Sequence, residues 1–155
     1  MQSHPHLRVL LVDDNITNLR LLNRILQKHF SHLFLTIVPL TSGVSALEQL
    51  QEVEFDLILL DIDMPVLDGV QTTKHIRSGQ CGKNREIPII AVTTNDDAEQ
   101  QLVYYRVGMN GCVGKPINVT LLGKAIEEAL TASRGTRSWP GIPPASDGTL
   151  VTSSS

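Results

Sequence analysis

Short apolar runs alternate along this chain with longer segments in which apolar residues recur at helical spacing. A run of this length, bounded by polar or turn-forming residues, is typical of a buried strand. The predicted strands occupy residues 7–12, 33–38, 55–61, 87–92 and 111–114. The predicted helices follow them, at residues 16–30, 44–50, 70–76, 98–105 and 121–130. The pattern therefore predicts five strand–helix units.

Three local signals mark where these elements start and stop. Asn15 precedes the first helical segment and is a suitable N-cap. Gly108 follows the fourth helical segment, where glycine commonly ends a helix. Residues 79–86 are polar and carry glycine, which indicates a loop, and Cys81 within it is expected to be an exposed free thiol.

Repeated strand–helix units predict an α/β fold with one parallel sheet covered by helices on both faces. The run at 55–61 is the least interrupted by polar residues, so it is expected to be central. A single doubly wound (βα)5 sheet with strand order 2-1-3-4-5, the flavodoxin-like order, places the first and third strands side by side.

The composition limits the classes of protein to which the chain could belong. It has 155 residues, which favours one domain, with 41% hydrophobic but only 4% aromatic residues, so the core must be aliphatic. The net charge of -3 argues against a nucleic-acid binder. No apolar segment reaches the roughly 20 residues of a membrane span, and no targeting pattern is present. Cys81 and Cys112 lack metal-ligand spacing. A cytoplasmic location, or a nuclear one in addition, is expected.

The ends of the chain differ in composition from the rest. Residues 1–6 are expected to be a flexible N-terminus, and residues 7–132 to form the folded domain. Residues 133–155 are rich in Ser, Gly, Thr and Pro and are expected to be a disordered tail, because they cannot bury enough apolar surface. The single tryptophan of the chain, Trp139, lies in this tail; it could be a docking residue, but it is interpreted as incidental.

Polar side chains with chemical potential follow the predicted strands. Asp13 and Asp14 follow the first strand, Asp61 ends the third, Thr93 ends the fourth and Lys115 follows the fifth. Because the carboxyl ends of parallel strands meet at one edge, these side chains are expected to converge. Any one of the acids alone would be interpreted as a helix or turn cap, but the set favours a site.

The convergent groups suit a divalent cation and a phosphoryl group. Mg²⁺ prefers a few carboxylate oxygens together with water and phosphate oxygens, so Asp14 and Asp61 could bind it directly and Asp13 through water. Three acids would repel one another without a cation or Lys115 nearby. Asp61 could act as a nucleophile and become an aspartyl phosphate, with the Thr93 hydroxyl bound to a phosphoryl oxygen.

Four motifs resemble the receiver domain of two-component response regulators, collinearly over residues 7–130. They are residues 12–15 (VDDN), 60–69 (LDIDMPVLDG), 89–93 (IIAVT) and 114–116 (GKP). The resemblance implies that Asp61 is the phosphoacceptor, Thr93 the switch hydroxyl and Lys115 the phosphate-binding lysine. It implies Mg²⁺ at Asp13, Asp14, Asp61 and the backbone carbonyl of Asp63, and a cis bond between Lys115 and Pro116. It also implies a partner carrying a phosphohistidine, either a histidine kinase or a histidine phosphotransfer protein.

One position departs from the family pattern. The family usually places an aromatic residue on the fifth strand, three residues before the lysine, and here that position is Cys112. In the family the ring swings inward as the hydroxyl moves to the phosphate, and a cysteine cannot reproduce that motion. Tyr104 and Tyr105 could take part instead, although one core and one surface tyrosine is the simpler interpretation.

Three functions are compared. The leading hypothesis is a phosphorelay receiver, a monomer or weak dimer that binds neither nucleic acid nor membrane and is not an enzyme beyond its own phosphorylation and dephosphorylation. The second is an aspartyl-phosphate phosphatase of the haloacid dehalogenase type, since Asp61 and Asp63 match its D-x-D spacing; the order of motifs argues against it. The third is a receiver-fold adaptor that is never phosphorylated. The chain could stand alone or be part of a longer protein such as a hybrid kinase.

Overall fold

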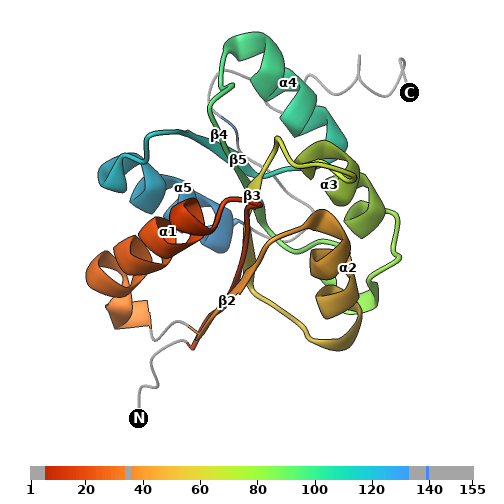
Figure 1. Cartoon of the computed structure of the whole chain (residues 1–155), viewed down its shortest axis with the longest axis horizontal. Helices are drawn as coiled ribbons and strands as arrows, with labels where there is room; N and C mark the ends of the chain where they lie inside the picture. Colours follow the sequence, from red (N-terminus) through yellow and green to blue (C-terminus); the bar gives the residue numbers. More distant parts are fainter. Residues whose placement is uncertain (1–5, 34–35, 133–138, 140–155) are drawn as a thin grey trace.

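Five parallel strands form one sheet in the order β2-β1-β3-β4-β5 (Figure 1). The computed structural model describes residues 6–33, 36–132 and 139. The strands are β1 (Arg8–Val12), β2 (Thr36–Leu40), β3 (Leu57–Asp61), β4 (Ile89–Thr93) and β5 (Gly111–Gly114). The predicted flavodoxin-like sheet, with β3 at its centre, is confirmed.

Five α-helices cover the two faces of this sheet. Figure 1 shows α1 and α5 on one side and α2, α3 and α4 on the other. Their bounds are α1 (Ile16–His29), α2 (Gly43–Glu52), α3 (Gly69–Arg77), α4 (Ala98–Val107) and α5 (Val119–Thr131), with short 3-10 turns at η1 (Ser31–Leu33) and η2 (Gly82–Asn84). Among the described residues, none of these helices has the length and apolar character needed to cross a membrane.

The core has two layers because successive strand side chains point to opposite faces. On β3, Leu57 and Leu59 pack in the layer under α1 and α5, whereas Ile58 and Leu60 pack in the layer under α2, α3 and α4. Every residue of β3 is buried. A strand covered on both faces must be apolar throughout, which explains the uninterrupted run in the sequence.

The helix signals in the sequence are present in the structure. The Asn15 side chain accepts a hydrogen bond from the Asn18 N–H at 3.1 Å and caps α1. Gly108 ends α4 with a φ of 113°, a left-handed conformation that glycine adopts without steric cost. Both helix ends could be predicted from the sequence because each cap involves residues only a few positions apart.

The second strand lies later in the chain than its predicted range of 33–38. β2 continues through Pro39 to Leu40, and Leu33 ends the turn η1. β2 is an edge strand whose only neighbour in the sheet is β1, so a residue without an N–H is tolerated there. The β-branched residues 36–38 correctly marked the strand, but both of its predicted ends were wrong.

The loop at 79–86 is packed against the domain rather than extended into solvent. Cys81 is buried, so its predicted exposure is wrong. Asn84 is also buried; its Nδ2 donates to the carbonyls of Leu50 (2.7 Å) and Val53 (2.9 Å), and its Oδ1 accepts from the N–H of Phe55 (3.0 Å). One polar side chain therefore ties the loop to the end of α2 and the approach to β3.

The terminal predictions fall mostly on residues outside those that the structure describes. The exception in the predicted tail is Trp139, which is only 6% exposed and belongs to the core layer beneath α4. Its interpretation as an incidental residue is therefore wrong. The division of the chain at residues 6 and 132 remains a prediction.

Candidate functional site

Strand register brings the polar strand-end residues to one edge of the sheet. Val12 of β1 pairs with Leu60 of β3. Asp13 and Asp61 each follow one of these two residues, so they lie side by side at the carboxyl ends of the two strands. On the next two strands of the sheet, Thr93 of β4 pairs with Gly114 of β5, and Lys115 follows Gly114 directly. The register is specified by burial, since a slip of one residue would turn every core side chain to the wrong face.

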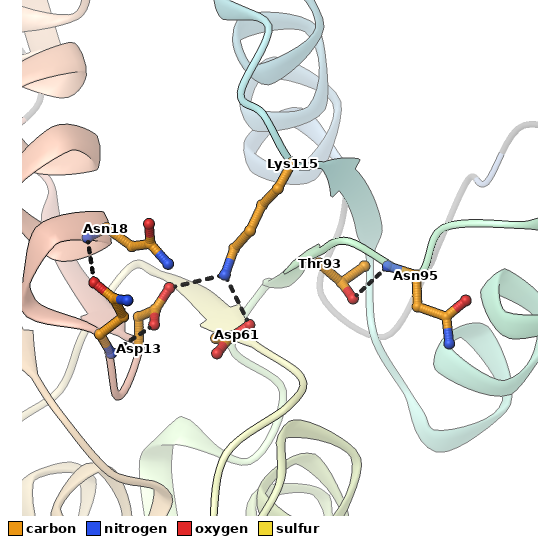
Figure 2. A network of polar contacts seen from close by, with 7 residues as sticks. Asp13, Asn18, Asp61, Thr93, Asn95 and Lys115 are labelled. Carbon is orange, nitrogen blue, oxygen red and sulfur yellow. Dashed lines mark hydrogen bonds and ion pairs between the residues drawn. The ribbon is translucent and has the colours of Figure 1, made fainter.

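Lys115 joins two of the acids. Its Nζ atom lies 3.0 Å from Asp13 Oδ2 and 3.1 Å from Asp61 Oδ1. Figure 2 shows the lysine side chain reaching from the end of β5 to a position between the two carboxylates. The ammonium group thus stands where a cation is needed to offset the repulsion of the acids.

Asp14 completes a cluster of three carboxylates. Asp13, Asp14 and Asp61 each offer an oxygen, and these oxygens lie within 4.8 Å of one another. Asp13 and Asp61 are buried, whereas Asp14 is exposed. A few carboxylate oxygens at a partly open position match the donor chemistry of Mg²⁺, which keeps several waters, so the cluster fits this ion. Asp63 is exposed and is not one of these carboxylates.

The two buried acids differ in how their oxygens are used. Asp13 Oδ1 accepts the N–H of Asn15 at 2.9 Å, and its Oδ2 contacts Lys115, so both oxygens have partners. Asp61 contacts Lys115 through Oδ1, and among the described residues no hydrogen bond to its Oδ2 is found. Asp61 therefore retains an oxygen that can act as a nucleophile or ligand.

Burial is the main influence on the protonation of Asp61. It raises the pKa of Asp61 to about 6, aided by the charges of Asp13 and Asp14 and opposed by the hydrogen bond and charge of Lys115. The pKa of Lys115 is raised: burial opposes this, but its contacts with Asp13 and Asp61 outweigh burial. A cation bound among the acids would favour the ionised form of Asp61.

The turn after β3 holds the backbone of Asp61 and Ile62 close to the start of α3. The N–H of Gly69 donates to the Ile62 carbonyl at 2.8 Å, and a Cβ at Gly69 would lie 2.5 Å from the Asp61 carbonyl oxygen. The N–H of Leu67 donates to the Pro65 carbonyl at 2.8 Å, with Val66 at a φ of 70°. A β-branched residue rarely adopts that conformation, so the turn is locally strained.

Thr93 connects the site to the loop that precedes α4. Thr93 is fully buried, and its Oγ1 accepts the N–H of Asn95 at 2.9 Å (Figure 2). The carbonyl of the same Asn95 accepts the hydroxyl of Tyr104 at 2.8 Å. Tyr104 is buried in the core and burial raises its pKa, so it remains a hydrogen-bond donor.

Two features of the fifth strand and the turn after it concern Cys112 and Pro116. Cys112 is half-buried, and burial, with a smaller contribution from Asp96, raises the pKa of its thiol to about 12. A raised pKa favours the neutral thiol over the nucleophilic thiolate. The Lys115–Pro116 bond is cis, as the resemblance implied.

The structure thus brings Asp13, Asp14, Asp61 and Lys115 together, with Thr93 at the end of the next strand. A cavity of about 780 Å³ lies elsewhere, and none of these residues lines it. Its lining includes Leu7 and Pro88, which precede β1 and β4 at the opposite edge of the sheet. The candidate site is therefore the acidic edge of the sheet and not this cavity.

Gln101 was not identified from the sequence, and Trp139 was named but interpreted as incidental. Both belong to a contact on α4, where Trp139 Nε1 donates to Gln101 Oε1 at 3.1 Å. The unique tryptophan was a signal for an anchoring residue, and Gln101 lies one helical turn before Tyr105. No local pattern in the sequence identifies α4 as the surface on which this tryptophan packs.

Comparison with known proteins gives a consistent set of relatives. A family model described as the response regulator receiver domain matches residues 9–127. The chain is 36% identical over 137 residues to stress response regulator protein 1 of Lodderomyces elongisporus, covering 87% of this chain and 36% of that protein. It is 37% identical over 116 residues to the signal transduction histidine-protein kinase BarA of Shigella flexneri, covering 75% of this chain and 12% of the kinase.

A solved structure extends these similarities to the fold. The receiver domain of the sensor histidine kinase PA1611 from Pseudomonas aeruginosa, crystallised with magnesium in its active site cleft, has a TM-score of 0.71 and 28% identity. The match covers 82% of this chain and 99% of that domain. The two sequence relatives, in contrast, are much longer than the part that this chain matches.

Proposed function

The chain belongs to the family of response regulator receiver domains, and from this premise we propose that Asp61 is its phosphoacceptor. The observation that carries the proposal is the pair of contacts from Lys115 to Asp13 and Asp61, with Asp14 in the same cluster of oxygens. The family match gives no support to the phosphatase or to the unphosphorylated adaptor.

Phosphoryl transfer requires an ionised and accessible carboxylate oxygen. Asp61 Oδ2 would attack the phosphorus of a phosphohistidine on a histidine kinase or histidine phosphotransfer protein. A P–O bond to Asp61 forms as the P–N bond to the imidazole breaks, and the imidazole nitrogen leaves with the electron pair of that bond. Such a transfer depends mostly on positioning and on neutralising negative charge.

The neighbouring residues have separate tasks in this proposal. Asp13, Asp14, Asp61 and the backbone carbonyl of Asp63 would hold Mg²⁺, which when bound neutralises charge between the acids and the phosphoryl oxygens. The Lys115 ammonium, already 3.1 Å from Asp61, would bind a phosphoryl oxygen once Asp61 is modified. The Thr93 hydroxyl would donate to another phosphoryl oxygen. No role for the chain as an enzyme beyond its own phosphorylation state is proposed.

We also propose the bounds of the folded domain and the kind of signalling in which it serves. The folded domain is assigned to residues 7–132, which contain the family match at 9–127. A relative named as a stress response regulator suggests that the chain serves in stress signalling through a phosphorelay.

The test is intact mass spectrometry after incubation with Mg²⁺ and acetyl phosphate. The wild type should gain one base-labile phosphoryl group, and Asp61→Asn should gain none. Asp63→Asn is the matched control, since it alters a neighbouring carboxylate but leaves the backbone carbonyl in place, and it should still be labelled.

Two results would contradict the proposal. Labelling of Asp61→Asn to the wild-type extent would place the phosphoryl group elsewhere. Failure of the wild type to accept a phosphoryl group, both from acetyl phosphate and from a phosphorylated histidine phosphotransfer protein, would favour the adaptor.

A further inference from the structure

Trp139 packs against helix α4 through two specific contacts. It is 6% exposed, and its ring meets that of Tyr105 edge to face, with centroids 5.8 Å apart and planes at 84°. Its indole N–H donates to Gln101 Oε1 at 3.1 Å. An edge-to-face aromatic pair combined with a satisfied indole N–H is a specific contact, not a general apolar one.

Gln101 is itself positioned by the loop that precedes α4. Its Nε2 donates to the carbonyl of Asp96 at 2.7 Å, so the orientation of the amide is fixed and its Oε1 is presented to Trp139. The next residue of the loop, Asp97, caps α4 by accepting the N–H of Gln100 at 2.8 Å. The surface that receives the indole therefore depends on where this loop lies.

The same loop begins at the candidate site. Asn95 donates its N–H to Thr93 Oγ1 and accepts the Tyr104 hydroxyl at its carbonyl. Thr93, Asn95 and Asp96 are thus linked to Tyr104 and Gln101 of α4 by hydrogen bonds over a span of only four loop residues. Asn95, which hydrogen-bonds to Thr93, is therefore the chain neighbour of Asp96, whose carbonyl orients Gln101.

We propose that Trp139 is an internal ligand of the surface formed by Gln101 and Tyr105, and that phosphorylation of Asp61 releases it. The inference rests on the proposed function. A phosphoryl group adds strong acceptor oxygens beside Thr93. When the Thr93 hydroxyl turns to donate to one of them, the Asn95 N–H loses its acceptor and the loop moves to find another.

Movement of the loop displaces two backbone carbonyls that accept hydrogen bonds from side chains of α4. The Asn95 carbonyl holds the Tyr104 hydroxyl, and the Asp96 carbonyl holds Gln101. Once Gln101 turns, the indole N–H loses its acceptor and the aromatic pair with Tyr105 loses its alignment. Phosphorylation would therefore vacate a surface shaped for an indole.

Trp139 is the single tryptophan of the chain, so its fluorescence reports this contact directly. The experiment uses the full chain with Mg²⁺, before and after acetyl phosphate, and measures emission, acrylamide quenching and intact mass in the same samples. We expect the unphosphorylated chain to emit as a buried indole. Phosphorylation should lower the ratio of seated to released Trp139 by about fivefold or more, which is the usual range of coupling between two sites.

Two variants, with Gln100→Leu as a control, separate the seating of Trp139 from its coupling to phosphorylation. Gln101→Leu should release Trp139 in both states, and Gln100→Leu on the same helix should behave as wild type. Tyr104→Phe keeps the ring but removes the hydroxyl bonded to Asn95; it should still be phosphorylated, with a smaller fluorescence response.

The outcomes distinguish this inference from the proposed function. If mass shows phosphorylation and the emission stays that of a buried indole, the release of Trp139 is disproved while Asp61 remains the phosphoacceptor. Emission of an exposed indole before phosphorylation would also overturn the inference. If no phosphoryl group is gained from any donor, both fail together.

Discussion

The amino group of Lys115 lies 3.1 Å from the Oδ1 atom of Asp61, although 54 positions separate the two residues in the chain. The same amino group reaches Asp13, so one cation serves two buried carboxylates. This arrangement makes the protonation of Asp61, the binding of Mg²⁺ and the acceptance of a phosphoryl group interdependent.

The first prediction concerns the stability of the metal-free protein as a function of pH. Burial raises the pKa of Asp61 to about 6, above its ordinary value of 3.8, so the folded state binds this proton more tightly than the unfolded state. The folded state therefore loses stability as the pH rises from about 4 through about 6. Asp61→Asn, which carries no charge, should raise the free energy of unfolding at pH 7.5 by about 3 kcal/mol and have little effect at pH 4.

Urea denaturation in the presence of a chelator measures this difference. Glu48→Gln is the control, because it removes the charge of an exposed carboxylate on α2 and should leave stability within about 0.5 kcal/mol. A stabilisation by Asp61→Asn that is equal at both pH values would show that relief of a buried charge is not its cause.

The second prediction concerns competition between Lys115 and Mg²⁺. The ammonium group contacts oxygens of Asp13 and Asp61 that the ion would use, so Lys115→Met removes a competing cation. Affinity for Mg²⁺ at pH 8 should rise by a few-fold, about 1 kcal/mol, while phosphorylation by acetyl phosphate becomes slower. Isothermal titration calorimetry gives the affinity.

Lys124→Met is the matched control for this change. Lys124 is exposed on α5, and its removal should leave both Mg²⁺ binding and the rate of phosphorylation unchanged. A tenfold loss of Mg²⁺ affinity in Lys115→Met would mean that the lysine organises the acids for the ion instead of competing with it.

The third prediction concerns the buried amide of Asn84. Asn84→Ala leaves the carbonyls of Leu50 and Val53 and the N–H of Phe55 without their partner inside the protein. Buried polar groups that lose a partner destabilise a protein by about 1–3 kcal/mol each at most, so a total loss of about 3 kcal/mol is expected. Thermal or urea unfolding measures it, and Lys83→Ala, at the exposed neighbouring position, should be nearly neutral.

The fourth prediction concerns the close approach of the turn to β3. A Cβ at Gly69 would lie 2.5 Å from the Asp61 carbonyl oxygen and 2.9 Å from Ile62 Cα, so backbone atoms must shift. Gly69→Ala should cost about 1–3 kcal/mol of stability and slow phosphorylation by displacing Asp61. Gly111→Ala, whose Cβ would meet its nearest neighbour at 3.7 Å, is the control and should retain wild-type phosphorylation.

Much of the fold could be predicted because parallel sheets leave a clear record in the sequence. A strand covered on both faces must be apolar, so runs such as 55–61 marked the strands, and the alternation with helical spacing predicted the topology. The predicted bounds of the edge strand β2 were the least accurate. An edge strand pairs on one side only, so not every residue needs a backbone N–H for pairing, and Pro39 is tolerated. The candidate site residues followed from topology, since residues at the carboxyl ends of parallel strands share one edge.

The sequence by itself determined the five strand–helix units, their order and the set Asp13, Asp14, Asp61, Thr93 and Lys115, because these depend on periodicity and on position relative to a strand end. Only the tertiary structure decided that Cys81 and Asn84 turn inward, and that Trp139 lies against Tyr105. Loop residues have no periodicity that records which way they face. Their side chains are placed by whichever unsatisfied carbonyl or aromatic surface the folded domain presents, and that surface exists only after distant segments have come together.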